Sequence, residues 1–379
     1  MHTQGMARIL LTGGRAPAAL ELARLFQRCG HCVDVAESWF WSASRFSRTV
    51  QRNLRVAPPR QAYAAFAQQL RRAVQRGRYD VLIPTCEEIF WVARARPLLS
   101  PHVTVFCPTL EELRELHDKY AFSQLLSKAG LPGPTTTLLQ SERELRAYAQ
   151  NAPESVYKPS YSRFGTRALI RPSPAQLKRV RPSKTHPWTA QHHKGGREWC
   201  AFAVLRAGAV AALGVYPARF PVGGASTYFQ AIHHPGIQAW VEAFGAFTLL
   251  TGQVAFDFKE DAAGLWALEC NPRLTSGLHL FRDQPEVTRT YLAPTPQEPL
   301  LAAPAGPLAL KAVMFLGGVR RASDWHAWRT ARDVMIAPHD PWPALMQPVV
   351  AGAWVVRALR LGTGVLEATT HDIEWNGEA

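Results

Sequence analysis

The N-terminal part of the chain alternates short apolar runs with segments of helical periodicity. Such alternation predicts βαβ units, in which parallel strands are joined by right-handed helical crossovers. We therefore expect an α/β fold that starts with a parallel sheet covered by helices. The expected strands are Arg8 to Thr12, Cys32 to Ala36, Asp80 to Pro84 and Val103 to Phe106, and the expected helices are Ala16 to Arg28, Arg60 to Arg76 and Glu87 to Ala95.

The first strand-to-helix turn is Thr12-Gly13-Gly14-Arg15. Its glycines permit a tight bend, and amides at the start of a helix can face an anion. Asp34 or Glu37 follows at about the distance that a dinucleotide-binding unit requires. However, the glycines do not match the G-x-G-x-x-G spacing, so the sequence does not favour NAD binding.

A later stretch predicts a hairpin that carries acidic side chains. Gln253 to Phe258 and Leu265 to Glu269 are two short expected strands, and each brings one carboxylate, Asp257 or Glu269, to its end. In antiparallel neighbours these carboxylates can lie on one face, and Asn271 points the same way because side chains alternate. Two carboxylates and an amide oxygen form an all-oxygen set that suits Mg²⁺.

Arginines and a small-residue loop accompany this hairpin. Arg273 comes directly after it and is suited to neutralising a transferring phosphoryl group or binding a substrate carboxylate. The loop from Ser160 to Arg167 follows an expected strand and contains hydroxyls, one glycine and two arginines. Such a loop can fold over phosphates, although an ordinary surface loop has a similar composition.

Together these features resemble the ATP-grasp superfamily, whose members include D-alanine ligases, biotin carboxylases and carbamoyl-phosphate synthetases. The resemblance covers about Arg8 to Phe281, and its most specific part is Asp257 with Glu269-Cys270-Asn271-Pro272-Arg273. The fold it implies has three parts. These are an N-terminal Rossmann-like parallel-sheet domain at 1–116, a two-lobed ATP-grasp domain at 117–290 (small lobe 117–190, large lobe 191–290), and a C-terminal α-rich extension at 291–379.

The resemblance also implies roles for individual residues. Lys119 and Lys158 would reach nucleotide phosphates, and Lys158 and Arg273 would take part in catalysis, with Arg273 stabilising an acyl phosphate. Gln191 stands where many members have Glu. The other implied contacts are a phosphate-covering loop with Ser160 and Gly165, an adenine-reading hinge at Gln191, His192 and His193, a ribose contact at Glu198, and Mg²⁺ (Mn²⁺ as an alternative) on Asp257, Glu269 and Asn271.

The acceptor side of the site is expected between Tyr216 and Thr227, a segment rich in glycine and aromatic residues. Arg219 in this segment is expected to bind a substrate carboxylate. Farther on, the segment from Leu292 to Pro307 is expected to be a linker. Helical patterns follow it, with Trp325, Trp328, Trp342 and Trp354 as expected packing anchors.

Charge and hydropathy limit the partners of the chain. Its formal net charge is +14 and its pI is near 9.9, which raises the question of an anionic partner. The arginines are scattered without a basic run, so a basic surface for nucleotide and carboxylate substrates is favoured over nucleic-acid binding. No uninterrupted apolar run reaches the length of a membrane span, and the first residues lack a signal-peptide pattern, so we expect a cytoplasmic protein.

The function that this resemblance implies is ATP-dependent ligation. A small carboxylate would be joined to an amine through an acyl phosphate, with release of ADP and phosphate. Two alternatives stay open: an ATP-dependent carboxylase or carbamate-forming enzyme, and a nucleotide-binding regulatory protein without turnover.

Overall fold

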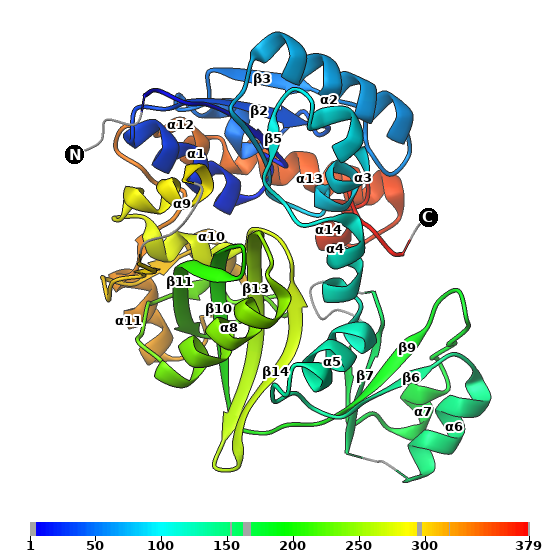
Figure 1. Ribbon diagram of the computed structural model, residues 1–379. Coiled ribbons are helices and arrows are strands. Elements are labelled where there is room, and N and C mark those ends of the chain that lie inside the picture. The colour runs from blue at the N-terminus through cyan, green and yellow to red at the C-terminus, as the bar shows by residue number, and fades with distance from the viewer. Residues whose placement is uncertain (1–4, 152–153, 162–167, 294–297, 318, 378–379) are drawn as a thin grey trace.

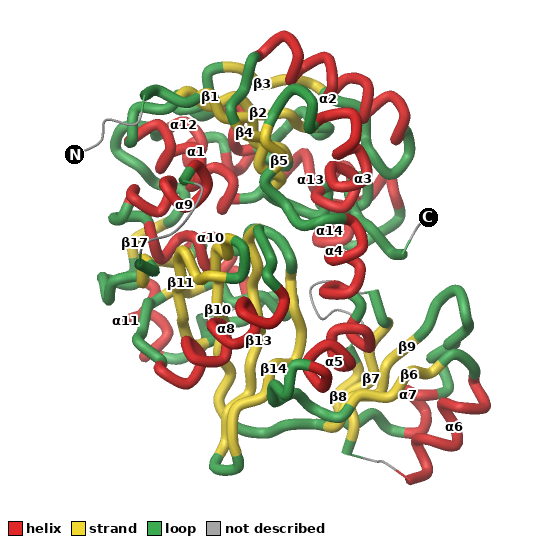
Figure 2. The backbone as a smooth tube through the Cα atoms, in the orientation of Figure 1, coloured by secondary structure: helices red, strands yellow, loops and turns green. Residues whose placement is uncertain are grey.

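The computed structural model describes residues 5–151, 154–161, 168–293, 298–317 and 319–377. It has a mixed α/β fold, which confirms the predicted class (Figure 1). One body contains a parallel sheet with helices on both sides, and below it lie two lobes built on antiparallel sheets (Figure 2). None of the helices in the described part of the chain has the length and hydrophobicity needed to cross a membrane.

The N-terminal sheet has the strand order β3-β2-β1-β4-β5, and all of its strands are parallel. The expected strands and helices are all present, with ends shifted by a few residues. Strand β3 was not predicted, because its sequence Arg52-Asn53-Leu54-Arg55 has a single apolar residue. The strands are β1 (Arg8–Thr12), β2 (Cys32–Glu37), β3 (Arg52–Arg55), β4 (Val81–Pro84) and β5 (Thr104–Val105), and the helices are α1 (Pro17–Arg28), α2 (Tyr63–Gly77), α3 (Ile89–Leu99) and α4 (Leu110–His117).

The small lobe is an antiparallel sheet of order β6-β9-β7-β8. The amphipathic pattern from His117 to Leu126 predicts one helix, but the structure ends α4 at His117 and starts a new helix at Lys119. The Asp118 carboxylate accepts hydrogen bonds from the amides of Tyr120 and Ala121, both at 2.9 Å, and so caps a new helix. The elements are α5 (Lys119–Lys128), β6 (Thr136–Leu139), α6 (Glu142–Asn151), β7 (Ser155–Pro159), β8 (Leu169–Ile170), α7 (Pro174–Leu177) and β9 (Trp188–His192).

The large lobe contains the predicted hairpin in a sheet of order β14-β13-β10-β11-β15. The two strands are longer than expected, because pairing continues to Asp261 and Gly264 and the Asp261 carboxylate accepts from the amide of Ala263 at 2.8 Å. Asp257 therefore lies within its strand and not at its end. The elements are β10 (Arg197–Arg206), β11 (Ala209–Pro217), β12 (Tyr228–Phe229), α8 (Pro235–Thr248), β13 (Gly252–Asp261), β14 (Gly264–Asn271), 3₁₀ turns at Ser276–Phe281 and Pro285–Thr288, and α9 (Arg289–Leu292).

The C-terminal extension is rich in helices but also carries three short strands. The expected linker contains one of them, β15, whose Leu300 pairs with Ala212 of β11. Of the tryptophans expected as packing anchors, Trp354 is buried, whereas Trp325 and Trp342 are 39% and 46% exposed. The elements are β15 (Leu300–Leu301), β16 (Leu308–Ala309), α10 (Lys311–Gly317), α11 (Ala322–Thr330), β17 (Arg332–Asp333), α12 (Trp342–Leu345), α13 (Gln347–Leu361) and α14 (Val365–Ala368).

The end of the described chain packs into the N-terminal domain. The indole of Trp375 is fully buried, with ring centroids 5.8 Å from Phe90 and 4.7 Å from Trp91. Trp91 also donates its indole N–H to the carbonyl of Ile373 at 3.0 Å. The C-terminal extension is thus part of the core of the N-terminal domain, and the predicted boundaries at 116, 190 and 290 stay predictions about separate domains.

Polar contacts join the N-terminal domain to the large lobe. The amide of Gln253 in β13 donates to the carbonyl of Pro84, the last residue of β4, at 2.7 Å. At a second contact, Arg282 of the large lobe pairs with buried Glu21 of α1 at 2.7 Å. These contacts bring the carboxyl end of β4 close to the acidic hairpin.

Candidate active site

Four side chains form one row across the large-lobe sheet. Tyr216 pairs with Cys200, Cys200 pairs with Asp257, and Asp257 pairs with Glu269, each directly across neighbouring antiparallel strands. Directly opposed side chains lie on the same face. The structure therefore brings the two predicted carboxylates together and adds a thiol and a phenol that the sequence did not single out.

The two carboxylates of this row have opposite pKa shifts. Burial and the charge of Glu269 raise the pKa of Asp257 to about 7. Burial opposes ionisation of Glu269 as well, but the ammonium groups of Lys119 and Lys158 outweigh it and lower the pKa of Glu269. A pair of carboxylates that resists full ionisation is an arrangement that a bound cation would relieve.

Two lysines point at Glu269 from the small lobe. The Nζ atom of Lys119 lies 3.8 Å from Oε2 of Glu269, and that of Lys158 lies 3.9 Å from the same oxygen. Lys119 is buried in the first turn of α5, where its amide donates to the carbonyl of Ser160 at 3.2 Å. The small lobe thus places two cations against an acid of the large lobe.

Asn271, the third residue of the predicted oxygen set, lies beside Asp257. It pairs with Ala255 in the sheet, and its amide nitrogen lies 3.5 Å from Oδ2 of Asp257. Among the residues that the structure describes, no group of three or more His, Cys, Asp or Glu side chains is placed to hold a metal ion. A cation at Asp257 and Glu269 would therefore depend on the amide oxygen of Asn271 and on ligand oxygens.

Lys119, Lys158, Asp257 and Glu269 form a charged cluster, and of the residues in the expected adenine hinge only Gln191 has a described contact with it. Gln191 is buried, accepts from Lys158 Nζ at 3.4 Å and donates to the carbonyl of Leu268 at 3.2 Å. His192 is exposed, and the ring of His193 lies 3.2 Å from the guanidinium of Arg171. The structure therefore connects Gln191, the first residue of the expected hinge, to Lys158, a contact that the sequence did not predict.

Glu198, the expected ribose contact, lies at the start of β10. Its exposed carboxylate pairs with Lys259 of β13 at 2.7 Å. Ser160, at the start of the expected phosphate-covering loop, is fully buried, and its hydroxyl has no hydrogen-bond partner among the described residues. Gly165 and the rest of this loop, residues 162–167, lie outside the described residues.

The two arginines expected on the substrate side differ in their surroundings. The Nε of Arg273 donates to the buried carboxylate of Glu87 at 2.8 Å, which ties the end of the hairpin to the turn after β4. Arg219 is exposed, and its guanidinium lies 4.8 Å from the ring centre of Tyr228 and 5.0 Å from that of Phe220. None of the described contacts of Arg219 reaches the carboxylate pair.

Glu87 is a residue of this site that sequence reasoning missed. It lies in Thr85-Cys86-Glu87-Glu88, directly after the buried strand β4. Polar residues at the carboxyl end of a parallel strand commonly form ligand sites. The position of Glu87 directly after β4 could therefore have indicated its place in the site.

The first glycine turn is filled by acidic side chains of the protein itself. Glu88 accepts from the hydroxyl of Thr12 at 2.7 Å, and a Cβ atom added at Gly13 would lie only 2.6 Å from the Glu88 carboxylate. Arg15, at the start of α1, pairs with Glu37 and Asp372 at 2.5 and 2.7 Å. The structure thus agrees with the sequence in disfavouring a dinucleotide at this turn.

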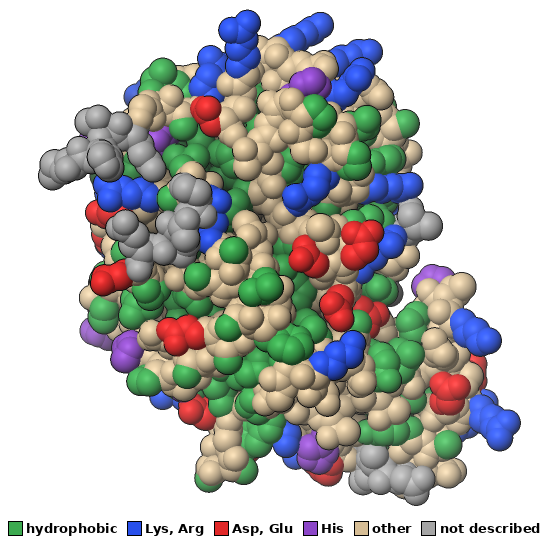
Figure 3. All heavy atoms as spheres, in the orientation of Figure 1, with side chains coloured by type: hydrophobic (Ala, Val, Ile, Leu, Met, Phe, Trp, Pro, Cys, Tyr) green, Lys and Arg blue, Asp and Glu red, His purple; other side chains and the backbone are tan. Residues whose placement is uncertain are grey.

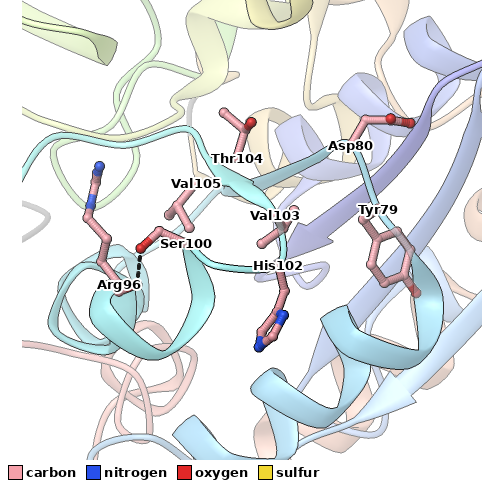
Figure 4. Close-up of a pocket in the computed structure, with 8 residues that line it drawn as sticks. All are labelled: Tyr79, Asp80, Arg96, Ser100, His102, Val103, Thr104 and Val105. Carbon is pink, nitrogen blue, oxygen red and sulfur yellow. Dashed lines mark hydrogen bonds between the residues drawn. The ribbon is translucent and has the colours of Figure 1, made fainter.

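Neither the cavity described next nor the distribution of surface charge helps to locate the candidate site. A cavity of about 500 Å³ opens at the amino ends of β4 and β5, where Asp80 and His102 line it, at the end of the sheet opposite to Glu87 (Figure 4). On the face shown in Figure 3, Lys and Arg side chains lie along the upper edge of the molecule, and acidic side chains gather near its middle. The candidate site is therefore defined by the convergent charges and not by the cavity.

Comparisons with known proteins fit this geometry. A scan against protein-family models gave no match, and a search of curated proteins gave none either. Solved structures do match. An L-amino acid ligase from Bacillus licheniformis matches with a TM-score of 0.62 and 14% identity, over 79% of this chain and 78% of that chain. N5-carboxyaminoimidazole synthetase from Staphylococcus aureus, complexed with ADP, matches with a TM-score of 0.61 and 13% identity, over 79% of this chain and 80% of that chain. The biotin carboxylase domain of 2-oxoglutarate carboxylase from Hydrogenobacter thermophilus, solved with MgADP, ADP and bicarbonate, matches with a TM-score of 0.63 and 14% identity, over 80% of this chain and 74% of that chain.

These likenesses extend over about four fifths of the chain and show its fold. The chain has the ATP-grasp fold, as the hairpin motif had indicated. At identities of 13–14% they show the fold, and the reaction has to be argued from the site.

Proposed function

We propose that this chain is an ATP-dependent ligase that joins a small carboxylate to an amine and releases ADP and phosphate. The observation that carries the proposal is the convergence of Lys119 and Lys158, from the small lobe, on Glu269 of the large lobe, at 3.8 and 3.9 Å. Two cations facing an acidic pair across two lobes form a site for an anionic group that brings its own cation, such as the phosphates of Mg-ATP.

Each part of the cluster has a role in this proposal. Lys119 and Lys158 bind the phosphate oxygens. Asp257, Glu269 and the amide oxygen of Asn271 would hold Mg²⁺, with Mn²⁺ as an alternative. Bound Mg²⁺ supplies charge neutralisation on the phosphates.

The nucleotide contacts proposed beyond the phosphates lie at the edge of the cluster. The backbone of Gln191, His192 and His193 reads adenine, and the Glu198 carboxylate accepts from the ribose hydroxyls after exchanging its pairing with Lys259. The loop that starts at Ser160 and contains Gly165 covers the phosphates and excludes water, which would otherwise hydrolyse an activated acid.

The proposed reaction has two steps. An oxygen of the substrate carboxylate attacks the γ-phosphorus of ATP, the bond to the β-phosphate oxygen breaks, and ADP leaves. The amine then attacks the acyl carbon, loses a proton and displaces phosphate. Arg273, with Lys158, stabilises the transferring phosphoryl group and the acyl phosphate, and Arg219 binds a carboxylate of the substrate.

A second candidate, ATP-dependent carboxylation, is favoured by one observation. The similar biotin carboxylase domain was solved with bicarbonate beside ADP, and bicarbonate is a small acid that the same charges suit. Both reactions use the acid as the attacking group, so they differ in which acid the site accepts.

An ADP-release assay separates these possibilities. The protein is incubated with Mg-ATP and a panel of amino acids, other small acids and amines, with and without bicarbonate. We expect ADP release only when an acid and an amine are both present. Dependence on bicarbonate alone would assign the carboxylase, and nucleotide binding without ADP release across the panel would assign a regulatory protein.

A further inference from the structure

Exposed apolar side chains concentrate in the C-terminal extension. Of the nineteen large hydrophobic side chains exposed in the described part of the chain, thirteen lie at or after Val313. Single exposed apolar residues are normal on a protein surface, but a concentration of them marks a contact surface. This surface is independent of the proposed active site.

The clearest part of this surface is a stripe along α12 and α13. Leu345, Val349, Val355 and Leu359 are 64%, 44%, 45% and 77% exposed, and Gly352 lies between them. Val349, Gly352, Val355 and Leu359 are separated by 3, 3 and 4 residues, which keeps them on one face of α13. Leu345 ends α12, and only Met346, whose backbone lies in the right-handed helical region, separates it from α13. The sequence of the stripe is symmetric about Gly352, with leucine seven residues away and valine three residues away on either side.

The opposite face of α13 fixes this helix to the protein. Trp354 and Ala358 are buried there, and the ring of Trp354 stacks on Trp39 with centroids 4.8 Å apart. Arg357 pairs with Asp372 at 2.9 Å. The stripe is therefore a rigid surface that the fold holds outward.

We propose that the stripe pairs with the stripe of a second copy of this chain, in an antiparallel arrangement about a twofold axis at Gly352. In a twofold interface the same patch serves both copies, so residue i contacts j and j contacts i. The symmetric spacing on α13 places Val349 opposite Val355 of the second copy, and Leu359 then extends towards the end of α12 of that copy, where Leu345 lies. A Cβ atom added at Gly352 would meet no atom within 4 Å, so the glycine lies in open space where a second helix can approach closely.

The charges near the stripe also favour a second copy of this chain as its partner. The segment from Leu345 to Leu361 contains two charged residues, Arg357 and Arg360, and no acid. Arg357 is engaged within the chain. Under the symmetry, Arg360 comes opposite Ala344 of the second copy, so no pair of like charges faces across the axis. Antiparallel helices also place opposite ends of their dipoles together.

The area fits a weak dimer. With Trp342 and Val356, which are 46% and 47% exposed, the stripe has six large apolar side chains. If the exposed part of each side chain is about 100 Å² and all of it is covered, each copy buries on the order of 600 Å². The total of about 1,200 Å² lies at the lower end of specific interfaces, so we expect a dimer that dissociates in the micromolar range.

Sedimentation velocity of the full chain, from low micromolar to about 100 µM, tests the proposal. We expect a concentration-dependent monomer–dimer equilibrium that Leu359→Glu shifts at least tenfold towards monomer. Leu316→Glu is the matched control, because Leu316 is 84% exposed on α10 outside the stripe, and it should leave the equilibrium unchanged. Thermal unfolding of both variants checks that the fold is retained.

A cysteine at the axis locates the interface. In a Cys29→Ser background, Gly352→Cys should form a disulfide-linked dimer under mild oxidation, because the axis places the two copies of this position within bridging distance. Leu316→Cys in the same background should stay monomeric. A monomer at every concentration, a dimer that Leu359→Glu does not weaken, or a monomer that instead binds lipid vesicles through the stripe would each overturn the proposal.

Discussion

The guanidinium of Arg273 donates to the Glu87 carboxylate at 2.8 Å, and this contact joins the end of the acidic hairpin to the N-terminal domain. Glu87 is 3% exposed, so its charge is shielded from water and the pair is held closely. An arginine that is already oriented can meet a developing negative charge without rearrangement. In the proposed reaction, Glu87 is therefore a positioning residue for Arg273.

Removing this acid should lower turnover more than nucleotide binding. We expect Glu87→Gln to lower kcat about tenfold and Glu87→Ala about a hundredfold, because the second variant also removes the hydrogen-bond acceptor. The dissociation constant of Mg-ATP should change less than threefold in both. A parallel loss of nucleotide affinity would show that Glu87 acts through the overall fold of the site.

The two lysines should determine nucleotide affinity. Lys119→Met and Lys158→Met each remove one cation from the phosphate-binding pair, and we expect the dissociation constant of an Mg-ATP analogue to rise about 10- to 100-fold. Titration calorimetry provides the measurement. Lys194→Met is the control, because Lys194 lies over the ring of Trp266 at 4.1 Å and is not part of the cluster.

The acidic pair should be essential for turnover but not for folding. Asp257→Asn and Glu269→Gln remove charges that would hold Mg²⁺, and we expect each to reduce ADP release by at least a hundredfold, or about 3 kcal/mol. Circular dichroism and unfolding curves should stay near those of wild type. Glu242→Gln, on the exposed face of α8, serves as the matched change. Turnover close to wild type at saturating Mg²⁺ in both site variants would remove the metal from the proposal.

Acid should weaken the contact between α1 and the large lobe. Burial alone would raise the pKa of Glu21, but hydrogen bonds and charge from His279 and Arg282 lower it to about 2. In the unfolded chain the pKa is about 4.3. The stabilisation is therefore complete above about pH 4.5 and is lost as the pH falls towards 2, and a shift of about two units corresponds to roughly 3 kcal/mol.

Urea unfolding of wild type and Glu21→Gln from pH 7 to pH 2.5 measures this effect. The variant should be less stable at pH 7, and the difference in the free energy of unfolding should shrink as the pH falls below 4. A difference that stays constant with pH would contradict the ionised contact.

Truncation of Trp375 should destabilise the N-terminal domain. We expect Trp375→Ala to reduce the free energy of unfolding by about 3–5 kcal/mol, because it leaves a cavity beside Phe90 and Trp91. Trp325→Ala, at a 39% exposed position, should cost about 1 kcal/mol or less. Similar urea midpoints for the two variants would mean that the Trp375 pocket collapses around the smaller side chain.

Local patterns were enough to predict the parallel sheet, the hairpin and the convergence of Asp257 with Glu269, because the two acids lie twelve residues apart in one supersecondary unit. The row that extends to Cys200 and Tyr216 could not be predicted. It depends on the register between β10 and β13, which are far apart in the sequence, and register is determined by tertiary packing. The Glu87 contact with Arg273 bridges 186 positions and depends on the docking of the two parts.

Two other differences have local physical causes. The helix break at Asp118 results from a side-chain cap that overrides the apolar periodicity. Trp325 and Trp342 were expected as packing anchors, but they are 39% and 46% exposed, and the contacts of Trp325 with Phe315 and Trp328 leave part of it uncovered.

The burial of Trp375 also affects how the chain acquires its fold during synthesis. Trp91 and Ile373 are in contact although 282 positions separate them. At roughly 5–20 residues per second, the ribosome needs about 15–60 s to produce the intervening chain. Throughout that time the face of α3 around Phe90 and Trp91 is uncovered, so the growing polypeptide offers an aromatic surface to chaperones or to premature association. The N-terminal domain thus leaves the ribosome before the two lobes but is completed only after them.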